Sequence, residues 1–137
     1  MYYFTSELIQ MISEVMRLNW KLDKNRPVCP QICEMLCVSI VNGTYGSEER
    51  LPSVREIATG LGVNPNTVQR ALETLEEQAL IYSVRGSGWY VGQDTHRARE
   101  VLEQMRRDKS AAFFSEMEML GMTPDEVKAF VQTYERE

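Results

Sequence analysis

Residues 63–92, VNPNTVQRALETLEEQALIYSVRGSGWYVG, restrict the fold of this chain more than any other stretch. Asn64 is a favourable helix N-cap, and Pro65 suits the first helical position because proline lacks the N–H that a helix start leaves unpaired. The positions that follow have helical spacing and form the expected buried face: Val68, Ala71, Leu72, Leu75 and Ala79. LIYSV and GWYVG are short strand candidates, and Gly86 and Gly88 permit the positive φ values of a tight hairpin. The stretch therefore predicts a helix followed by a β-hairpin.

Two more helices are expected before this stretch. In LPSVREIATGLG, Ser53 and Glu56 have the spacing of a capping box, in which each side chain accepts a hydrogen bond from the other residue's backbone N–H. A longer helix is expected to begin near Pro30 and to end at NGTYG, with four buried positions: Ile32, Leu36, Ile40 and Val41. Three helices followed by a hairpin are the order of a winged helix-turn-helix.

Amphipathic helices are expected on both sides of this domain. Residues 4–22 carry apolar side chains at helical spacing, and the same pattern resumes from His96 and ends at Gly121, before a second, shorter helix. We therefore divide the chain into an N-terminal amphipathic helix (1–24), a winged-helix domain (25–93) and a two-helix tail (94–137). The predicted fold class is mainly α.

The bulk composition narrows the class of protein. A hydrophobic fraction of 43% with 26% charged residues is typical of a globular domain. No apolar run approaches the roughly 20 residues that cross a bilayer, and the apolar N-terminus lacks a basic leader, so we expect a cytoplasmic protein. We find no nucleophile motif and no phosphate-binding loop, which argues against an enzyme and predicts no cofactor.

Cys29, Cys33 and Cys37 repeat at every fourth position, so they share one face of the first predicted helix of the domain. A tetrahedral metal site needs a fourth ligand, and the chain has a single histidine, His96. Free cysteine is among the residue types most often buried. We therefore expect core packing rather than a metal or redox site.

The net charge of −5 is unfavourable for binding phosphate, and none of the three segments is basic overall. Along the helix from Pro65, however, the charges are sorted. Its first two turns carry amides, a hydroxyl and Arg70, whereas Glu73 and the later glutamates lie further along. A helix amino end carries partial positive charge and unpaired N–H groups, which suit a phosphate, while amides and hydroxyls suit base edges. These features predict DNA binding through a few placed groups.

The preceding short helix and the hairpin turn add to this prediction. The first helix of a helix-turn-helix touches the DNA backbone, and an arginine at a wing turn reaches a phosphate or a minor groove. The predicted DNA-binding set is Ser53, Arg55, Asn64, Pro65, Asn66, Thr67, Gln69, Arg70, Arg85 and Gly86. Two alternatives stay open: Gln69 and Arg70 also fit a solvated helix face, and Arg55 also fits an ion pair with a nearby glutamate.

LPSVREIATGLGVNPNTVQRALETLEEQALIYSVRGSGWYV resembles the DNA-binding domain of the GntR family of bacterial transcription regulators, without a gap from Leu51 to Val91. RPVCPQICEMLCVSIVNGTYGSEERLPS resembles the family's first helix. LPSVRE, VNPNTV and RGSGWYV are most similar to the YtrA-like subfamily, which carries a short two-helix dimerisation tail. The resemblance implies a regulator of a nearby transporter operon, with DNA contacts at the positions just given. Many relatives have basic residues where this chain has Pro65 and Gln69, which implies a different pattern of base contacts.

The tail is rich in methionine and aromatic residues, and two helices alone cannot bury that much apolar surface. We therefore expect a homodimer. Its predicted interface comprises Val101, Leu102, Met105, Phe113, Met117, Leu120, Val127, Phe130, Val131 and Tyr134. An effector pocket within that interface is the alternative use of the methionines.

These features predict a sequence-specific DNA-binding transcription regulator. A twofold dimer presents its two DNA-reading helices about 34 Å apart, one turn of B-DNA, and so selects an inverted-repeat operator. A small dimer across a promoter blocks polymerase, which favours a repressor. The alternative function is a winged-helix adaptor that holds other proteins and does not bind DNA.

Overall fold

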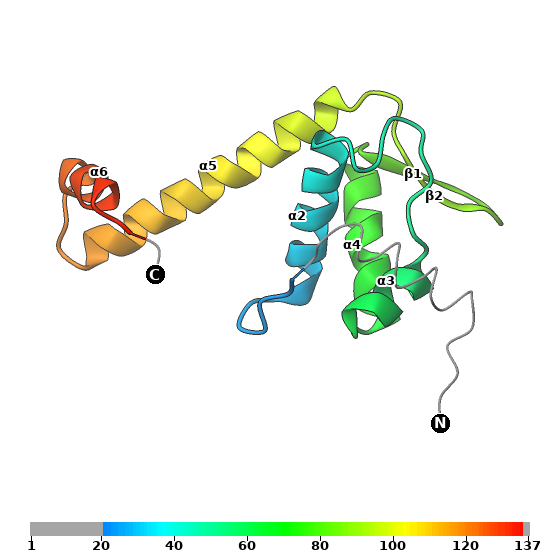
Figure 1. The fold of residues 1–137 in the computed structure, drawn as a ribbon, viewed down its shortest axis with the longest axis horizontal. Helices are drawn as coiled ribbons and strands as arrows, with labels where there is room; N and C mark the ends of the chain where they lie inside the picture. The colour runs from blue at the N-terminus through cyan, green and yellow to red at the C-terminus, as the bar shows by residue number, and fades with distance from the viewer. Residues whose placement is uncertain (1–20, 136–137) are drawn as a thin grey trace. The chain divides into compact units, whose positions relative to one another are not determined.

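The computed structural model describes residues 21–135, and their elements follow the predicted order of a winged helix and a helical tail (Figure 1). The described residues form helices α2 (Val28–Val41), α3 (Val54–Leu61) and α4 (Pro65–Glu77), strands β1 (Ile81–Val84) and β2 (Gly88–Val91), and helices α5 (His96–Met119) and α6 (Pro124–Gln132). The helix predicted at residues 4–22 lies outside the described residues, apart from Lys21 and Leu22, which are not helical.

Packing divides the chain into two compact units, the first ending at Leu102 and the second beginning at Glu103. The division falls within α5, since the helix starts at His96. Ala98, Val101 and Leu102, in the first two turns of α5, are buried. The winged-helix unit therefore extends beyond the hairpin into the start of α5. No helix among residues 21–135 has the length and apolar character needed to cross a membrane.

The core of the first unit lies where α2 and α3 pack on α4 (Figure 1). Fully buried side chains from these helices include Ile32, Leu36, Ile57, Val68, Leu72 and Leu75. The structure corrects three expectations at the helix ends. α2 begins at Val28, before the predicted start near Pro30, because Pro27 occupies the N-cap position, and Val41 is only half-buried. Ala79 is exposed rather than packed, because it follows the C-cap of α4 and has a φ of 63°.

Both helices of the helix-turn-helix start as predicted. At α3, the Ser53 hydroxyl accepts from the Glu56 amide (3.1 Å) and the Glu56 carboxylate accepts from the Ser53 amide (3.3 Å). At α4, the Asn64 side chain accepts from the Asn66 amide (2.8 Å), with Pro65 at the first helical position. Gly62 ends α3 in the left-handed conformation that glycine adopts without strain. The turn between α3 and α4 is therefore fixed at both ends.

β1 and β2 form the predicted antiparallel hairpin, with Ile81 opposite Val91 and Val84 opposite Gly88. The turn between them comprises residues 85–87. Gly86 and Gly88 have φ values of 79° and 132°, as the sequence predicted.

A third stretch, residues 49–51, pairs with the other edge of β2. The amide of Leu51 donates to the carbonyl of Trp89, and the amide of Val91 donates to the carbonyl of Glu49, both at 2.9 Å. The sequence did not predict this pairing, because the stretch lacks alternating apolar residues. Both edges of β2 are therefore hydrogen-bonded, so the wing is anchored to the body of the first unit.

The second unit is built differently. Its helix α6 begins with the predicted capping box of Thr123 and Glu126, with Pro124 at the first helical position. Val127 is fully buried, whereas Leu120, Phe130 and most other apolar side chains of this unit lie exposed. The predicted helix end at Gly121 is confirmed by its positive φ of 91°.

Candidate nucleic-acid interface

The amino end of α4 carries no acidic residue in its first turn. Asn64, Asn66 and Arg70 are exposed, and Thr67 and Gln69 are half-buried along the same two turns. Pro65 has no N–H, the Asn66 amide donates to the Asn64 side chain (2.8 Å), and the Thr67 amide donates to the Asn64 carbonyl (3.0 Å). This end therefore offers the partial positive charge of a helix start, polar side chains and one cation to a ligand.

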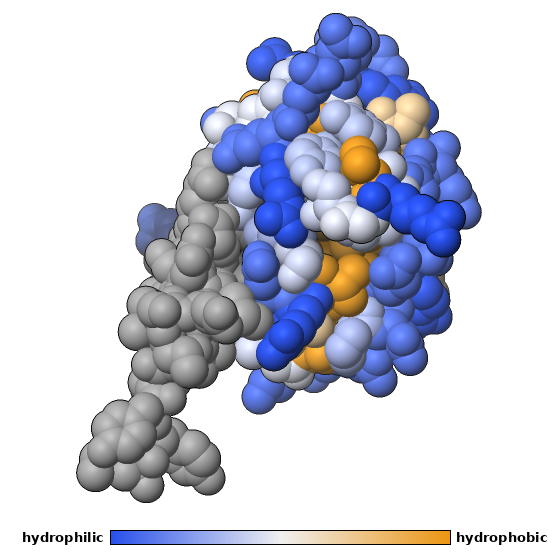
Figure 2. All heavy atoms as spheres, turned by 90° about the vertical axis from the view of Figure 1, so that its right-hand side faces the viewer, coloured by the Kyte–Doolittle hydropathy of each residue, from blue (hydrophilic) through white to orange (hydrophobic). Residues whose placement is uncertain are grey.

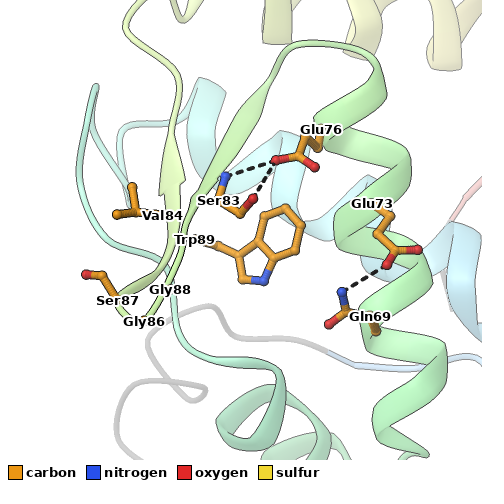
Figure 3. A pocket seen from close by; sticks show the side chains of 9 residues that line it. All are labelled: Gln69, Glu73, Glu76, Ser83, Val84, Gly86, Ser87, Gly88 and Trp89. Atoms are coloured by element: carbon orange, nitrogen blue, oxygen red, sulfur yellow. Dashed lines mark hydrogen bonds between the residues drawn. The ribbon is translucent and has the colours of Figure 1, made fainter.

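Two of the exposed carboxylates that follow on α4 accept hydrogen bonds from other side chains or backbone groups of the chain (Figure 3). Glu73 accepts from the side-chain amide of Gln69 (3.0 Å). Glu76 accepts from both the backbone N–H and the hydroxyl of Ser83 in β1, each at 2.9 Å. Each of these hydrogen bonds offsets part of the carboxylate charge, and the bonds from Ser83 tie the wing to α4. The sequence analysis missed this pair, since Glu76 and Ser83 follow no motif.

An open groove of about 570 Å³ separates α4 from the wing. Figure 3 shows Trp89 of β2 in this groove, between the hairpin and the helix, with Glu73 and Glu76 on the α4 side. Because Glu73 and Glu76 line the groove together with residues 86–88 of the wing, the groove itself does not suit a phosphate.

Three arginines of the predicted set are exposed: Arg55 in α3, Arg70 in α4 and Arg85 in the wing turn. Within residues 21–135, none of the three makes an ion pair or a side-chain hydrogen bond. Among the described residues Arg55 has no glutamate partner, and the neighbouring Glu56 serves the α3 capping box. Cations without an internal counter-charge are the groups that bind phosphate with release of counterions.

Ser53 and Gly86 complete the predicted set. Ser53 is half-buried and its hydroxyl caps α3, so its contribution to a ligand would come from the helix start that it fixes. Gly86 is exposed in the wing turn, and a Cβ at this position would meet no atom within 4 Å.

Figure 2, which views the side of the first unit where the hairpin projects, shows a mainly hydrophilic surface with small hydrophobic areas between the polar side chains. This surface suits a polar partner.

The cysteines lie apart from this interface, in α2. Cys33 and Cys37 are buried, and burial raises the pKa of each thiol to about 12; nearby Cys29, Cys37 and Glu34 add to the effect at Cys33, and Glu34 adds to it at Cys37. The Cys33 thiol donates to the carbonyl of Ala71 in α4 (3.5 Å). In the part of the chain that the structure describes, no group of histidine, cysteine and acidic residues has the arrangement of a metal site. Cys33 and Cys37 pack in the core, as expected.

Comparison with known proteins agrees with this fold. The family model "Bacterial regulatory proteins, gntR family" matches residues 30–91. A solved GntR family transcriptional regulator from Listeria monocytogenes is 39% identical, with a TM-score of 0.71 over 83% of this chain and 100% of that one. The HTH-type transcriptional regulator YhcF of Bacillus subtilis is 27% identical over 83% of this chain and 94% of its own. The HTH-type transcriptional repressor YtrA of the same organism is 37% identical over 50% of this chain and 52% of its own.

The fold, the candidate interface and the comparisons together place this chain in the class of DNA-binding transcription regulators with a winged helix-turn-helix. Within this class the chain belongs to the gntR family of bacterial regulatory proteins. The resemblance to the YtrA-like subfamily is supported by the identity with YtrA. The expectation of a regulator rather than an enzyme is confirmed by membership of this family.

Proposed function

We propose that this regulator binds an inverted-repeat operator as a homodimer and represses transcription from the cytoplasm. The observation that carries the proposal is the group of three exposed arginines, Arg55, Arg70 and Arg85, without ion pairs in residues 21–135, around a helix end that has no acid in its first turn. An overall charge of −5 does not prevent DNA binding if the acids lie elsewhere or are engaged internally.

Each group has a defined role in the proposal. The side chains of Asn66, Thr67, Gln69 and Arg70 read base edges in the major groove, and Asn64 and Pro65 place the α4 amino end against a phosphate. Arg55 and the helix start fixed by Ser53 hold the DNA backbone, while Arg85 and Gly86 reach a phosphate or the flanking minor groove. Because Gln69 donates to Glu73 (3.0 Å), its amide orientation is set before DNA arrives.

The second unit supports the dimer. Met119, Leu120, Phe130 and Tyr134 are 85%, 78%, 56% and 75% exposed, and so much apolar surface on one small helical unit indicates an interface. We assign the interface to the accessible members of the predicted set: Met105, Phe113, Met117, Leu120, Phe130, Val131 and Tyr134. Val101, Leu102 and Val127 are already buried in the chain, so we leave them out of the proposed interface.

Repression is favoured by the relatives. YtrA and the NagR protein of Bacillus subtilis, which is 34% identical over 72% of this chain, are both named as transcriptional repressors. A small dimer covering a promoter excludes polymerase without any surface for activation.

Selection of bound duplexes from a random pool tests the proposal. The purified full chain should enrich an inverted repeat whose half-site centres lie about 10 base pairs apart. A mutant with Arg55→Gln and Arg70→Gln serves as the matched control and should enrich nothing. If the wild-type chain also enriches no sequence, operator binding is wrong, and the adaptor function takes its place. Enrichment of a single, unrepeated half-site would support DNA binding but contradict the proposed homodimer.

A further inference from the structure

Arg50 lies beside the wing in a position that the sequence analysis did not single out. The residue stands opposite Tyr90 in the stretch that pairs with the outer edge of β2. A Cβ built on Gly88 would lie 3.3 Å from Nε and 3.6 Å from Nη2 of Arg50. The guanidinium therefore extends along the sheet from its own backbone to the first residue after the wing turn.

The face that carries Arg50 is ordered by its neighbours. Tyr82 and Tyr90 are cross-strand partners with stacked rings, 5.7 Å between centroids. The hydroxyl of Tyr90 also forms a hydrogen bond with the hydroxyl of Ser87 in the turn. These contacts link the turn to the strand residue opposite Arg50, so the backbone of Arg50 and the turn keep a fixed relation.

The charge of Arg50 is not neutralised within the described part of the chain. Its side chain is exposed and makes neither an ion pair nor a hydrogen bond with residues 21–135. The adjacent Glu49 has its carboxylate directed to the Gly46 amide (2.7 Å). By contrast, Arg106 and Arg107 of α5 both pair with Glu103, at 3.5 and 3.8 Å. Like Arg55, Arg70 and Arg85 of the proposed interface, Arg50 is exposed and makes no ion pair within the described residues.

We propose that Arg50 is a further DNA-binding residue, which holds a backbone phosphate beside the wing while Arg85 occupies the turn. This inference rests on the proposed function. Gly88 has a part in the proposal, because a Cβ at that position would lie 3.3 Å from Nε of Arg50 and would crowd the guanidinium. A phosphate contact carries no base preference, so Arg50 should strengthen binding to every duplex by the same factor.

The test compares Arg50→Gln with Arg50→Lys and with Arg99→Gln. Arg99 is an exposed arginine of α5 that likewise makes no ion pair within the described residues, so it controls for loss of charge alone. Dissociation constants are measured by fluorescence anisotropy between about 50 and 200 mM salt, on the selected duplex and on a scrambled one. Unfolding by urea is measured for all variants to show that the fold is kept.

Arg50→Gln should weaken binding several-fold on both duplexes and reduce the slope of log K against log salt by about 2, one phosphate contact in each subunit. Arg50→Lys should keep the slope, and Arg99→Gln should match the wild type. The inference is overturned if Arg50→Gln keeps the wild-type slope while Arg55→Gln lowers it, or if its effect is confined to the selected duplex. If the wild-type chain binds neither duplex, the proposed function fails as well.

Discussion

The two units of this protein treat their apolar and charged side chains in opposite ways. The first unit buries its apolar residues around α2, α3 and α4 and leaves the arginines at positions 50, 55, 70 and 85 without ion pairs in the described residues. The second unit pairs Arg106 and Arg107 with Glu103 but exposes most of its apolar surface. The two units therefore expose different kinds of surface: the first exposes arginines without ion pairs in the described residues, and the second exposes apolar side chains.

This difference separates the two partners by chemistry. Uncompensated cations attract a polyanion, and the interaction weakens with salt. Exposed methionine, leucine and aromatic side chains attract another apolar surface, and that association is little affected by screening of charge. The proposed function therefore assigns one unit to DNA and the other to a second copy of the chain, and it predicts that each can be disabled without the other.

Disrupting the tail should have the largest effect. Leu120→Asp combined with Phe130→Asp places charges on exposed apolar positions of the second unit and should yield monomers in sedimentation. Because the two half-sites are then bound separately, affinity for the inverted repeat should fall by about 10² to 10⁴. Affinity for a single half-site should stay unchanged.

Gln132→Asp, at an exposed polar position of α6, is the matched control and should remain a dimer. A double variant that is monomeric yet binds the inverted repeat as tightly as the wild type would show that the tail does not couple the half-sites.

A substitution that creates a cavity in the core of the first unit should lower the free energy of unfolding. Leu72 is fully buried in α4, so Leu72→Ala should lower the free energy of unfolding by about 2 to 5 kcal/mol. Val84→Ala, at a 43% exposed position of the wing, should have a much smaller effect. Urea unfolding followed by tryptophan fluorescence measures both. Equal losses in the two variants would contradict the assigned core.

Removing an arginine of the interface should act on DNA rather than on the fold. Arg55→Ala and Arg70→Ala should each reduce operator affinity by about 1 to 3 kcal/mol where a base contact is lost, and by less where a phosphate contact is lost. Arg106→Ala, which breaks an exposed ion pair in α5, should leave operator affinity near the wild-type value. Unchanged binding in both interface variants would remove these residues from the interface.

The buried thiols should produce the smallest effect, confined to alkaline pH. The pKa of Cys33 and of Cys37 is about 12 in the folded chain and 9.0 without the fold. Because the folded state disfavours the thiolate, the associated stability is complete below pH 9 and is lost as the pH rises from 9 towards 12. A variant with Cys33→Ala and Cys37→Ala should lose this part of the pH dependence in urea unfolding. A profile identical to the wild type would show that the thiols do not contribute.

The helix starts, the wing turn and most core positions of α4 could be predicted from the sequence, because the interactions that determine them lie within a few residues. The capping residues Ser53 and Asn64, Pro65 and the wing glycines act within a few residues of their own position, so their roles follow from spacing alone. The expected core positions of α4 were largely correct for the same reason, and Ala79 failed because the helix ended just before it.

Features that depend on pairing between different elements could not be predicted. The bonds from Ser83 to Glu76 join a strand to the helix before it, and the closeness of Arg50 to Gly88 joins residues far apart along the chain; neither pair follows a motif. In the tail, helical spacing identified the apolar positions but could not tell Val127, which the chain itself buries, from Phe130, which it leaves exposed.

The salt dependence of binding to the selected duplex tests the central claim most directly, since that claim rests on arginines that make no ion pair with residues 21–135. Each phosphate contact adds about 0.9 to the slope of log K against log salt, so four arginines in each of two subunits give an upper limit of about 7. We predict a steep negative slope that becomes much shallower when Arg50, Arg55, Arg70 and Arg85 are all changed to Gln. A slope near zero in the wild-type protein, or one that the fourfold variant leaves unchanged, would contradict the account.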